Sequence, residues 1–276
     1  MTKRSHPDPH AVPRVAVLGV PWDERSSFLR GAALAPPVVR AALRSPSSNL
    51  STESGLDLGA EPRLLDAGDL EVPPGDAALA AIEQGVARVL AGGARVLALG
   101  GDHAISYPVV RAQARAHGPL AILHLDAHPD LYDEFAGDRF SHACPFARIM
   151  DEGLAGRLVQ VGIRTANAHQ RAQAARFGVE TIAMAAWRPD LALELDGPVY
   201  VSLDLDVLDP GFAPGVSHHE PGGLSTREVI GLLQRLRGRV VGADLVELNP
   251  ARDPAGTTAM VAAKLVKELL ARLLAG

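Results

Sequence analysis

Cysteine is nearly absent from this sequence, since Cys144 is the only one among 276 residues. A disulfide within the chain is therefore excluded, and a reducing compartment suits this composition. The lack of several cysteines also argues against a structural zinc site built from thiolates. Long apolar runs are missing too, because segments such as 15–20 are far too short to span a bilayer.

Basic stripes are also missing. The chain carries 27 Lys and Arg against 32 Asp and Glu, for a net charge of −5 and a pI near 6.1. A protein that tracks nucleic-acid phosphates would need a concentrated positive surface. Residues 1–14 are polar and interrupted by proline, without the apolar core of a secretory signal. We therefore expect a cytoplasmic protein that binds neither nucleic acid nor membranes.

The hydrophobic content of 47% is enough to bury a large core. Short apolar runs alternate with helical patterns, which is typical of βαβ units and of a mostly parallel sheet. No repeat or linker divides the chain, so we predict one α/β domain over residues 1–276. The expected strands are 14–20, 63–67, 95–100, 119–126, 158–163, 179–184, 198–206 and 239–247. The expected helices are 36–44, 76–91, 104–117, 142–153, 167–177, 225–237 and 257–274.

Residues at the ends of the expected helices support these boundaries. Asp76 is a suitable N-cap for the helix at 76–91, and Gly92 is a suitable stop. Thr257 would cap the last helix in the same way. The segment 45–60, rich in serine and glycine, is expected to be a long surface loop.

Polar motifs follow several of the expected strands, where open α/β sheets bind ligands. Gly100-Gly101-Asp102-His103 comes after the run VLAL, and the two glycines allow a tight turn. His103 would then begin the next helix and face the crevice. By itself this motif is also compatible with an ordinary turn between a strand and a helix.

A second motif, HLDAHPD, follows the run PLAIL. Asp126, His128 and Asp130 are spaced at i, i+2 and i+4, so an extended chain would place them on one face. Pro129 favours extended backbone at His128. Such strict alternation after a buried strand is unusual for a solvated turn, and it indicates a ligand site.

The third motif, SLDLDVLDP, places Asp204 and Asp206 on one face of a strand, with Leu203 and Leu205 on the other. Two like charges about 7 Å apart at the edge of a sheet resist burial unless cations balance them. Asp209 is better suited to an Asx-type contact in the turn before Pro210.

Together these motifs supply six potential metal ligands. Carboxylates with some imidazole suit Mn²⁺. Six ligands are too many for one ion that keeps an open position, and they suit a pair of ions about 3.5–4 Å apart. The predicted ligands are His103, Asp126, His128, Asp130, Asp204 and Asp206.

Several further residues are candidates for the same site. Glu247, in DLVELNP, is suited to bind a guanidinium group through two hydrogen bonds. His142 is a candidate proton shuttle, because imidazole titrates near neutral pH. His218 and Ser141 are weaker candidates for binding substrate. We interpret Cys144 as a small buried residue rather than a nucleophile.

These motifs resemble those of the ureohydrolase family, which includes arginases, agmatinases, guanidinobutyrases and formimidoylglutamases. The likeness lies in GGDHAIS, HLDAHPDLYD, SHACPFARIMDEG, QVGIR, SLDLDVLDP and DLVELNP, between residues 100 and 250. It extends to GVPWDERSSFLRGAALAPPVVR near the start and TTAMVAAKLVKELL near the end. The wording is most similar to that of the branch containing plant arginases and agmatinases.

The resemblance implies a three-layer α/β/α fold around a parallel eight-stranded sheet, assembled as a homo-trimer or homo-hexamer. It implies one Mn²⁺ on His103, Asp126, Asp130 and Asp204, and a second on Asp126, His128, Asp204 and Asp206. A hydroxide between the ions would attack the guanidinium carbon. His142 would pass a proton to the leaving amine, and Glu247 would hold the guanidinium.

Two departures from the family pattern leave the substrate open. The loop that grips the amino-acid end of arginine in animal arginases is replaced here by LYDEFAGDRFSHACP. The Thr-Gly-Thr stretch usual in agmatinases is replaced by VSHH before EPGG. We expect agmatine or arginine as the substrate, with a guanidino acid as the alternative.

Three other functions are compatible with parts of the sequence. A zinc deacetylase would use one ion, which leaves no role for His103 and for either Asp126 or Asp130. An amidinotransferase would use Cys144 as a thiolate. A metal-stabilised binding protein or pseudoenzyme would keep the ligands without turnover.

Overall fold

The computed structural model describes residues 13–275, and all of its eight strands belong to one sheet. The strand order is β2-β1-β3-β8-β7-β4-β5-β6, and every neighbouring pair is parallel. Residues 1–12 lie outside the described range. The prediction that residues 1–14 are not a secretory signal falls mostly on this segment. Among the described residues, no helix has the length and apolar character needed to cross a membrane.

The elements agree with the predicted order of strands and helices. The strands are β1 (Arg14–Gly19), β2 (Leu64–Asp69), β3 (Ala94–Leu99), β4 (Leu120–Leu125), β5 (Ala155–Val161), β6 (Glu180–Ile182), β7 (Glu194–Asp204) and β8 (Arg237–Val246). The α-helices are α1 (Ala35–Leu43), α2 (Ala77–Ala91), α3 (Ser106–His117), α4 (Pro145–Asp151), α5 (Ala168–Phe177), α6 (Thr226–Arg235) and α7 (Thr257–Leu274). Short 3-10 turns are η1 (Ala32–Leu34), η2 (His103–Ile105), η3 (Met184–Ala186), η4 (Leu205–Val207) and η5 (Pro250–Arg252).

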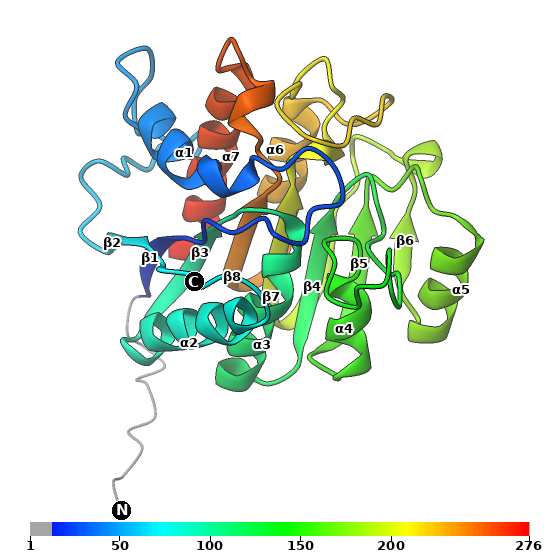
Figure 1. Cartoon of the computed structure of the whole chain (residues 1–276). Helices are drawn as coiled ribbons and strands as arrows, with labels where there is room; N and C mark the ends of the chain where they lie inside the picture. Colours follow the sequence, from blue (N-terminus) through cyan, green and yellow to red (C-terminus); the bar gives the residue numbers. More distant parts are fainter. Residues whose placement is uncertain (1–12, 276) are drawn as a thin grey trace, which may run out of the picture.

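Helices cover both faces of the sheet, which confirms the three-layer α/β/α architecture (Figure 1). The apolar faces of α1, α6 and α7 pack into one buried cluster, and those of α2, α3 and α4 into another. The central strands lie between these layers, and every residue of β4 is buried. The mostly apolar sequence of these strands follows from burial on both faces.

The strand order brings the chemically interesting strand ends together. β3, β8, β7 and β4 are consecutive neighbours at the centre of the sheet. Because all four strands are parallel, their carboxyl ends lie along the same edge. Each of the four polar motifs found in the sequence begins at one of these ends.

Some predicted helix boundaries were wrong. The helix expected at 142–153 begins only at Pro145, after an irregular segment. Thr257 is the first residue of α7 rather than its cap, and the side chain of Asp253 accepts the N–H groups of Thr258 and Ala259. Asp76 precedes α2 as predicted but forms no hydrogen bond to it, because its carboxylate pairs with Arg25.

Candidate metal centre

His103 lies at the end of β3, in the turn that leads into η2. Gly101 makes this turn possible, because a Cβ at that position would lie 1.8 Å from the backbone oxygen of Trp22. The His103 side chain is fully buried. Its Nδ1 atom lies 3.0 Å from Asp126 Oδ2, 3.0 Å from Asp130 Oδ2 and 3.2 Å from Asp204 Oδ2.

The segment with Asp126, His128 and Asp130 is a loop rather than an extended strand, so the predicted geometry was wrong. β4 ends at Leu125, and the N–H of His128 donates back to Asp126 Oδ1 at 2.6 Å. Asp130 adopts a left-handed backbone conformation, with φ of 50°. This turn, and not alternation along a strand, brings Asp130 close to His103.

Asp204 has the extended geometry that we predicted, whereas Asp206 departs from it. Asp204 is the last residue of β7, and Asp206 lies in the 3-10 turn η4. Asp204 Oδ1 accepts the N–H of Asp206 at 2.7 Å. Asp206 Oδ2 lies 2.9 Å from His128 Nδ1, which places these two side chains in the same cluster. The structure therefore brings all six predicted ligands together.

The charges of this cluster are not balanced by the protein alone. Burial, together with the charges of Asp206 and Asp126, raises the pKa of Asp204 well above its usual value. Burial and the charge of Asp126 raise the pKa of Asp206 to about 6. His103 Nδ1 forms no hydrogen bond, although three carboxylate oxygens lie close to it. An unpaired nitrogen among crowded carboxylates fits a site for divalent cations.

His142 and Glu247 form a second group beside the ligands. Glu247 follows β8 in a left-handed conformation, with φ of 67°, and its Oε1 lies 3.3 Å from His142 Nδ1. Burial opposes protonation of His142, but the hydrogen bond and charge of Glu247 outweigh it and raise the pKa of His142 to about 9. Ser27 Oγ lies 2.8 Å from His142 Nε2. The pair can therefore hold a proton beside the cluster.

A cavity of about 260 Å³ opens onto both groups. Half-buried His218 lines it, as does Glu220, whereas buried Ser141 is not among the lining residues. Cys144 is fully buried and does not line the cavity, and burial and the charge of Asp130 raise the pKa of its thiol to about 12. The lining is Ser27, His128, Asp130, Tyr132, Phe135, His142, Ala143, Thr165, Gln170, Asp204, Asp206, His218, Glu220 and Glu247.

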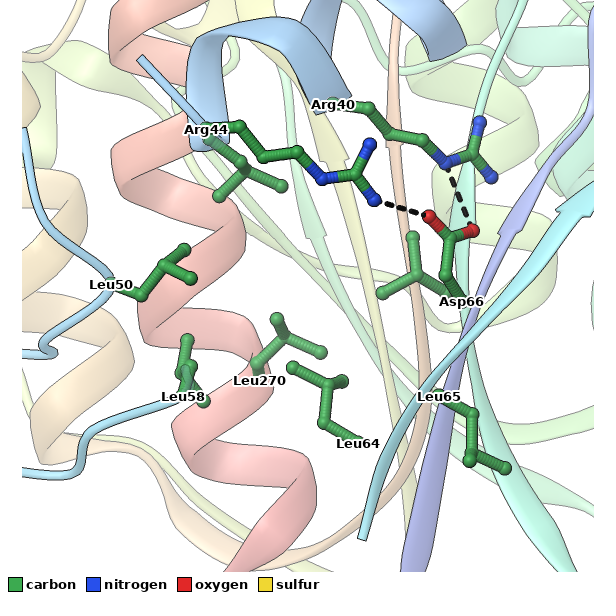
Figure 2. Close-up of a pocket in the computed structure, with 10 residues that line it drawn as sticks. Arg40, Arg44, Leu50, Leu58, Leu64, Leu65, Asp66 and Leu270 are labelled. Carbon is green, nitrogen blue, oxygen red and sulfur yellow. Dashed lines mark hydrogen bonds and ion pairs between the residues drawn. The ribbon is translucent and has the colours of Figure 1, made fainter. Parts of the chain in front are cut away.

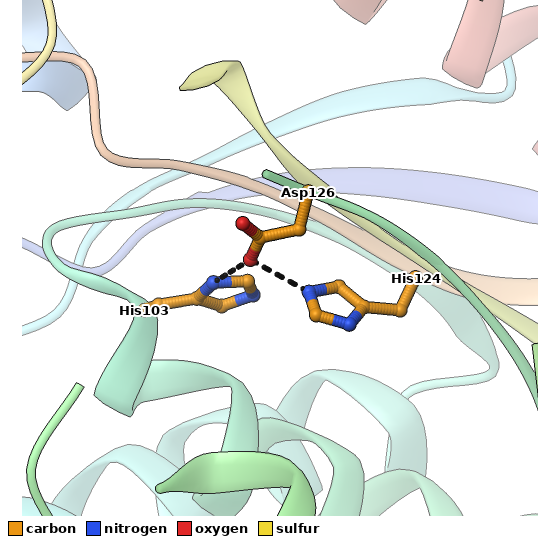
Figure 3. A group of neighbouring side chains, drawn as sticks. All are labelled: His103, His124 and Asp126. Carbon is orange, nitrogen blue, oxygen red and sulfur yellow. Dashed lines mark hydrogen bonds and ion pairs between the residues drawn. The ribbon is translucent and has the colours of Figure 1, made fainter. Parts of the chain in front are cut away.

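Sequence reasoning missed two residues that position this site. His124 Nε2 lies 2.8 Å from Asp126 Oδ2, on the side opposite His103, as Figure 3 shows. Its ring stacks on Phe146 at 3.8 Å between centroids. The spacing of His124 two residues before Asp126 was a usable signal. Ser27 gave none, because it comes from a distant loop and reaches His142 only in the folded chain.

Asp209 confirms its predicted structural role. Its two carboxylate oxygens accept the N–H groups of Gly211 and Gly222, at 2.9 and 2.7 Å. These contacts hold the turn after η4. Asp209 is therefore occupied by backbone and is not part of the ligand cluster.

Comparison with known proteins places this architecture in a family. The model of the arginase family matches residues 13–271. Arginase 1, mitochondrial, of Arabidopsis thaliana is 50% identical, over 94% of this chain and 80% of that protein. N(1)-aminopropylagmatine ureohydrolase of Thermus thermophilus is 40% identical, over 88% of this chain and 85% of that protein. The solved arginase from Medicago truncatula has a TM-score of 0.90 at 46% identity, covering 95% of this chain and 88% of that one.

Proposed function

The chain belongs to the arginase family, and we propose that it hydrolyses a guanidino compound to urea and an amine at a centre holding two Mn²⁺ ions. The observation that carries this proposal is the convergence of six ligand side chains on one edge of the sheet. His103 Nδ1 lies within 3.2 Å of carboxylate oxygens from three different ligands and forms no hydrogen bond. Two divalent ions held there supply a strong oxygen nucleophile from water near neutral pH.

The ligands would divide between the two ions as the resemblance implies. His103, Asp130, Asp126 and Asp204 would hold one ion, and the contacts around His103 Nδ1 support this set. His128 and Asp206 would complete the other with Asp126 and Asp204, and the 2.9 Å contact between His128 and Asp206 supports that set. Carboxylates shared between both sets would hold the ions close together.

Glu247 would orient the substrate. Its carboxylate is buried at the cavity, so it would pair with a guanidinium cation and fix the plane of that group. The carbon of this resonance-stabilised cation is a poor electrophile, and positioning therefore matters as much as nucleophile strength. The residue binds and orients, without forming a covalent bond.

His142 would donate a proton to the leaving amine. When water adds to the guanidinium carbon and the bond from that carbon to the tail nitrogen breaks, the leaving amine needs a proton. His142 carries one at neutral pH, because Glu247 raises its pKa to about 9. Ser27 and His218 lie beside this ring and would guide its orientation.

The substrate that we favour is agmatine or arginine, with a guanidino acid as the alternative. The arginases among the compared relatives favour arginine, and the aminopropylagmatine ureohydrolase is named for a derivative of agmatine. Urea release from arginine, agmatine, 4-guanidinobutyrate and 3-guanidinopropionate with added Mn²⁺ tests the proposal. We expect release from one of the first two, abolished by a chelator. No urea from any of the four compounds would contradict the proposal.

A thiolate mechanism makes the opposite prediction. An amidinotransferase would lose turnover in Cys144→Ser and would tolerate chelators. The buried thiol, with its pKa raised to about 12, argues against that mechanism. We expect Cys144→Ser to keep at least about half of the urea-forming activity, because this substitution leaves the cavity lining unchanged.

The metal count separates the remaining alternatives. A zinc deacetylase would bind one ion per subunit, and a pseudoenzyme would bind ions without releasing urea. We also propose a trimer or hexamer, as the resemblance implies, and a cytoplasmic location, because the single cysteine suits a reducing compartment. Mass photometry tests the oligomer, and fractionation of cells tests the location.

A further inference from the structure

A buried polar cluster lies behind His103, at the ring nitrogen that does not face the carboxylates. Asp244 of β8 is at its centre, with Tyr200 and Ser202 of β7 and Ser106 at the start of α3 around it. All of these side chains are fully buried. Nothing in the proposed mechanism uses them, although a buried carboxylate is costly and calls for a reason.

The hydroxyl protons of this cluster are all committed to Asp244. Tyr200 and Ser106 each donate to Asp244 Oδ2 at 2.7 Å, and Ser202 donates to Asp244 Oδ1 at 2.7 Å. An ionised carboxylate accepts hydrogen bonds and has no proton to give. A serine hydroxyl has one proton, so Ser202 has none left for another partner.

The number of available hydroxyl protons determines which ring nitrogen of His103 is protonated. Ser202 Oγ lies 3.0 Å from His103 Nε2, so this hydrogen bond needs a proton from the imidazole. His103 Nε2 therefore donates to Ser202. In the neutral ring the other nitrogen, Nδ1, then carries a lone pair and no proton.

Nδ1 faces the carboxylates of Asp126, Asp130 and Asp204, whose oxygens lie 3.0, 3.0 and 3.2 Å away. A metal ion that takes the place of a proton on Nδ1 meets the nitrogen lone pair and these oxygens together, and each of these contacts is attractive. We infer that Asp244, acting through Ser202, is a positioning residue that holds His103 in the tautomer able to bind a metal ion through Nδ1. This inference rests on the proposed two-ion centre.

Such a partner behind a metal-binding histidine sets both the tautomer and the orientation of the ring. Here the chain of contacts runs from β8 through β7 to the end of β3, three strands at the centre of the sheet. The paired strands hold it rigidly, since Ser202 and Asp244 are register partners. The centre is therefore prepared before any ion arrives.

Asp244→Asn reverses the direction of the two hydrogen bonds that join His103, Ser202 and residue 244, and it keeps the size of the side chain. Its amide nitrogen donates to Ser202, so the Ser202 hydroxyl turns toward His103 and donates to Nε2. Nδ1 then carries the proton. We expect the affinity for the ion bound by His103 to fall roughly 10–100-fold, as for other partners behind metal ligands.

Two measurements on metal-free protein test this reversal. Calorimetric titration with Mn²⁺ gives the number of ions and the affinity of each. Nitrogen NMR of histidine-labelled protein, with His103→Gln to assign the signals, reports which ring nitrogen is protonated. We expect His103 Nε2 to be protonated in the wild type, where it donates to Ser202, and unprotonated in Asp244→Asn.

Tyr200→Phe is the matched control. It removes one donor from Asp244 but leaves the contact between Ser202 and His103 in place. We expect a lower unfolding midpoint with Mn²⁺ affinity within about threefold of wild type, because a buried hydrogen bond contributes about 1 kcal/mol of stability. A purely structural role for Asp244 would make both variants bind Mn²⁺ alike.

If Asp244→Asn does not fold, Ser202→Ala and Ser202→Thr replace it. The alanine removes the acceptor for His103 Nε2 and should weaken binding, and the threonine keeps a hydroxyl and should restore most of it. Wild-type affinity and an unchanged tautomer in folded Asp244→Asn or Ser202→Ala would overturn the inference. Fewer than two ions in the wild type would instead overturn the proposed function, so the two failures are distinguishable.

Discussion

The metal centre and a second cavity, beside α1 and α7, are both lined partly by charged side chains, but they differ in how those charges are balanced. The cavity of about 120 Å³ beside α1 and α7 has a floor of leucines and a rim formed by Arg40, Arg44 and Asp66 (Figure 2). Asp66 Oδ1 lies 3.0 Å from Arg40, and Oδ2 lies 3.0 Å from Arg44. Opposite charges cancel there, and Arg44 is 68% exposed.

In the cavity at the carboxyl ends of the central strands, by contrast, the charges are not balanced. Its carboxylates are buried beside one another, and the pKa of Asp204 rises because burial and like charges oppose ionisation. Uncompensated buried charge is expensive, so it persists where a ligand balances it. Buried carboxylates without enough cationic partners therefore distinguish the functional site, whereas a cavity with charged residues alone does not.

Removing a shared carboxylate should have the largest effect. We expect Asp126→Asn to lose both metal ions and nearly all urea-forming activity, because Asp126 contacts both His103 and His128. Metal analysis after dialysis and a urea assay measure the two losses. Asp209→Asn, an acidic residue of the nearby turn outside the cluster, is the control. Full turnover with both ions in Asp126→Asn would refute the assignment.

Removing the proton carrier should have the next largest effect. We expect His142→Asn to lower kcat by about 10²–10⁴, since this is the usual contribution of general acid–base catalysis. Both ions should remain bound, because His142 is not among the ligands. Steady-state kinetics with metal analysis checks this. Loss of metal together with activity would assign His142 to the ion site instead.

The pH dependence of stability sharpens the comparison in metal-free protein. The pKa of His142 is raised from 6.5 to about 9, so protonated His142 stabilises the fold fully below about pH 6.5. This contribution is lost as the pH rises toward 9. We expect the denaturation midpoint of wild type, relative to His142→Asn, to fall over that window. Parallel curves for the two proteins would show that the Glu247 contact adds no stability.

The balanced cavity should give the smallest effect. We expect Arg44→Ala to change stability by no more than about 1 kcal/mol, because pairs with exposed partners contribute little. Urea-forming activity should stay unchanged. Thermal unfolding and the urea assay measure both. A marked change in kcat would mean that this cavity communicates with the metal centre and that the distinction between the two is wrong.

Much of the fold was predictable because burial leaves a direct mark on sequence. Strands such as β4, apolar except for His124, are buried because helices cover both faces, and the polar motif after each central strand stands out against that background. The capping error at Thr257 has a different origin. Asp253 also satisfies the requirement for a capping side chain, and nothing local decides between the two.

The geometry of the ligands was less predictable than their identity. Alternation in HLDAHPD suggested an extended chain, but the left-handed conformation of Asp130 turns the segment back toward His103. The bond from His128 N–H to Asp126 also closes this loop. Backbone conformation there is selected by contacts with other strands, which spacing along one segment does not encode.

The sequence by itself determined which side chains are available at the metal centre, because carboxylates and imidazoles directly after buried strands are costly unless they bind a ligand. Only the tertiary structure decided that β3, β8, β7 and β4 are neighbours, that Ser27 reaches His142, and that Asp244 lies behind His103. The physical reason is that strand order and the partners of buried polar groups depend on packing between distant segments. The local sequence pattern shows which buried polar groups need a partner, and the folded chain determines which residue is that partner.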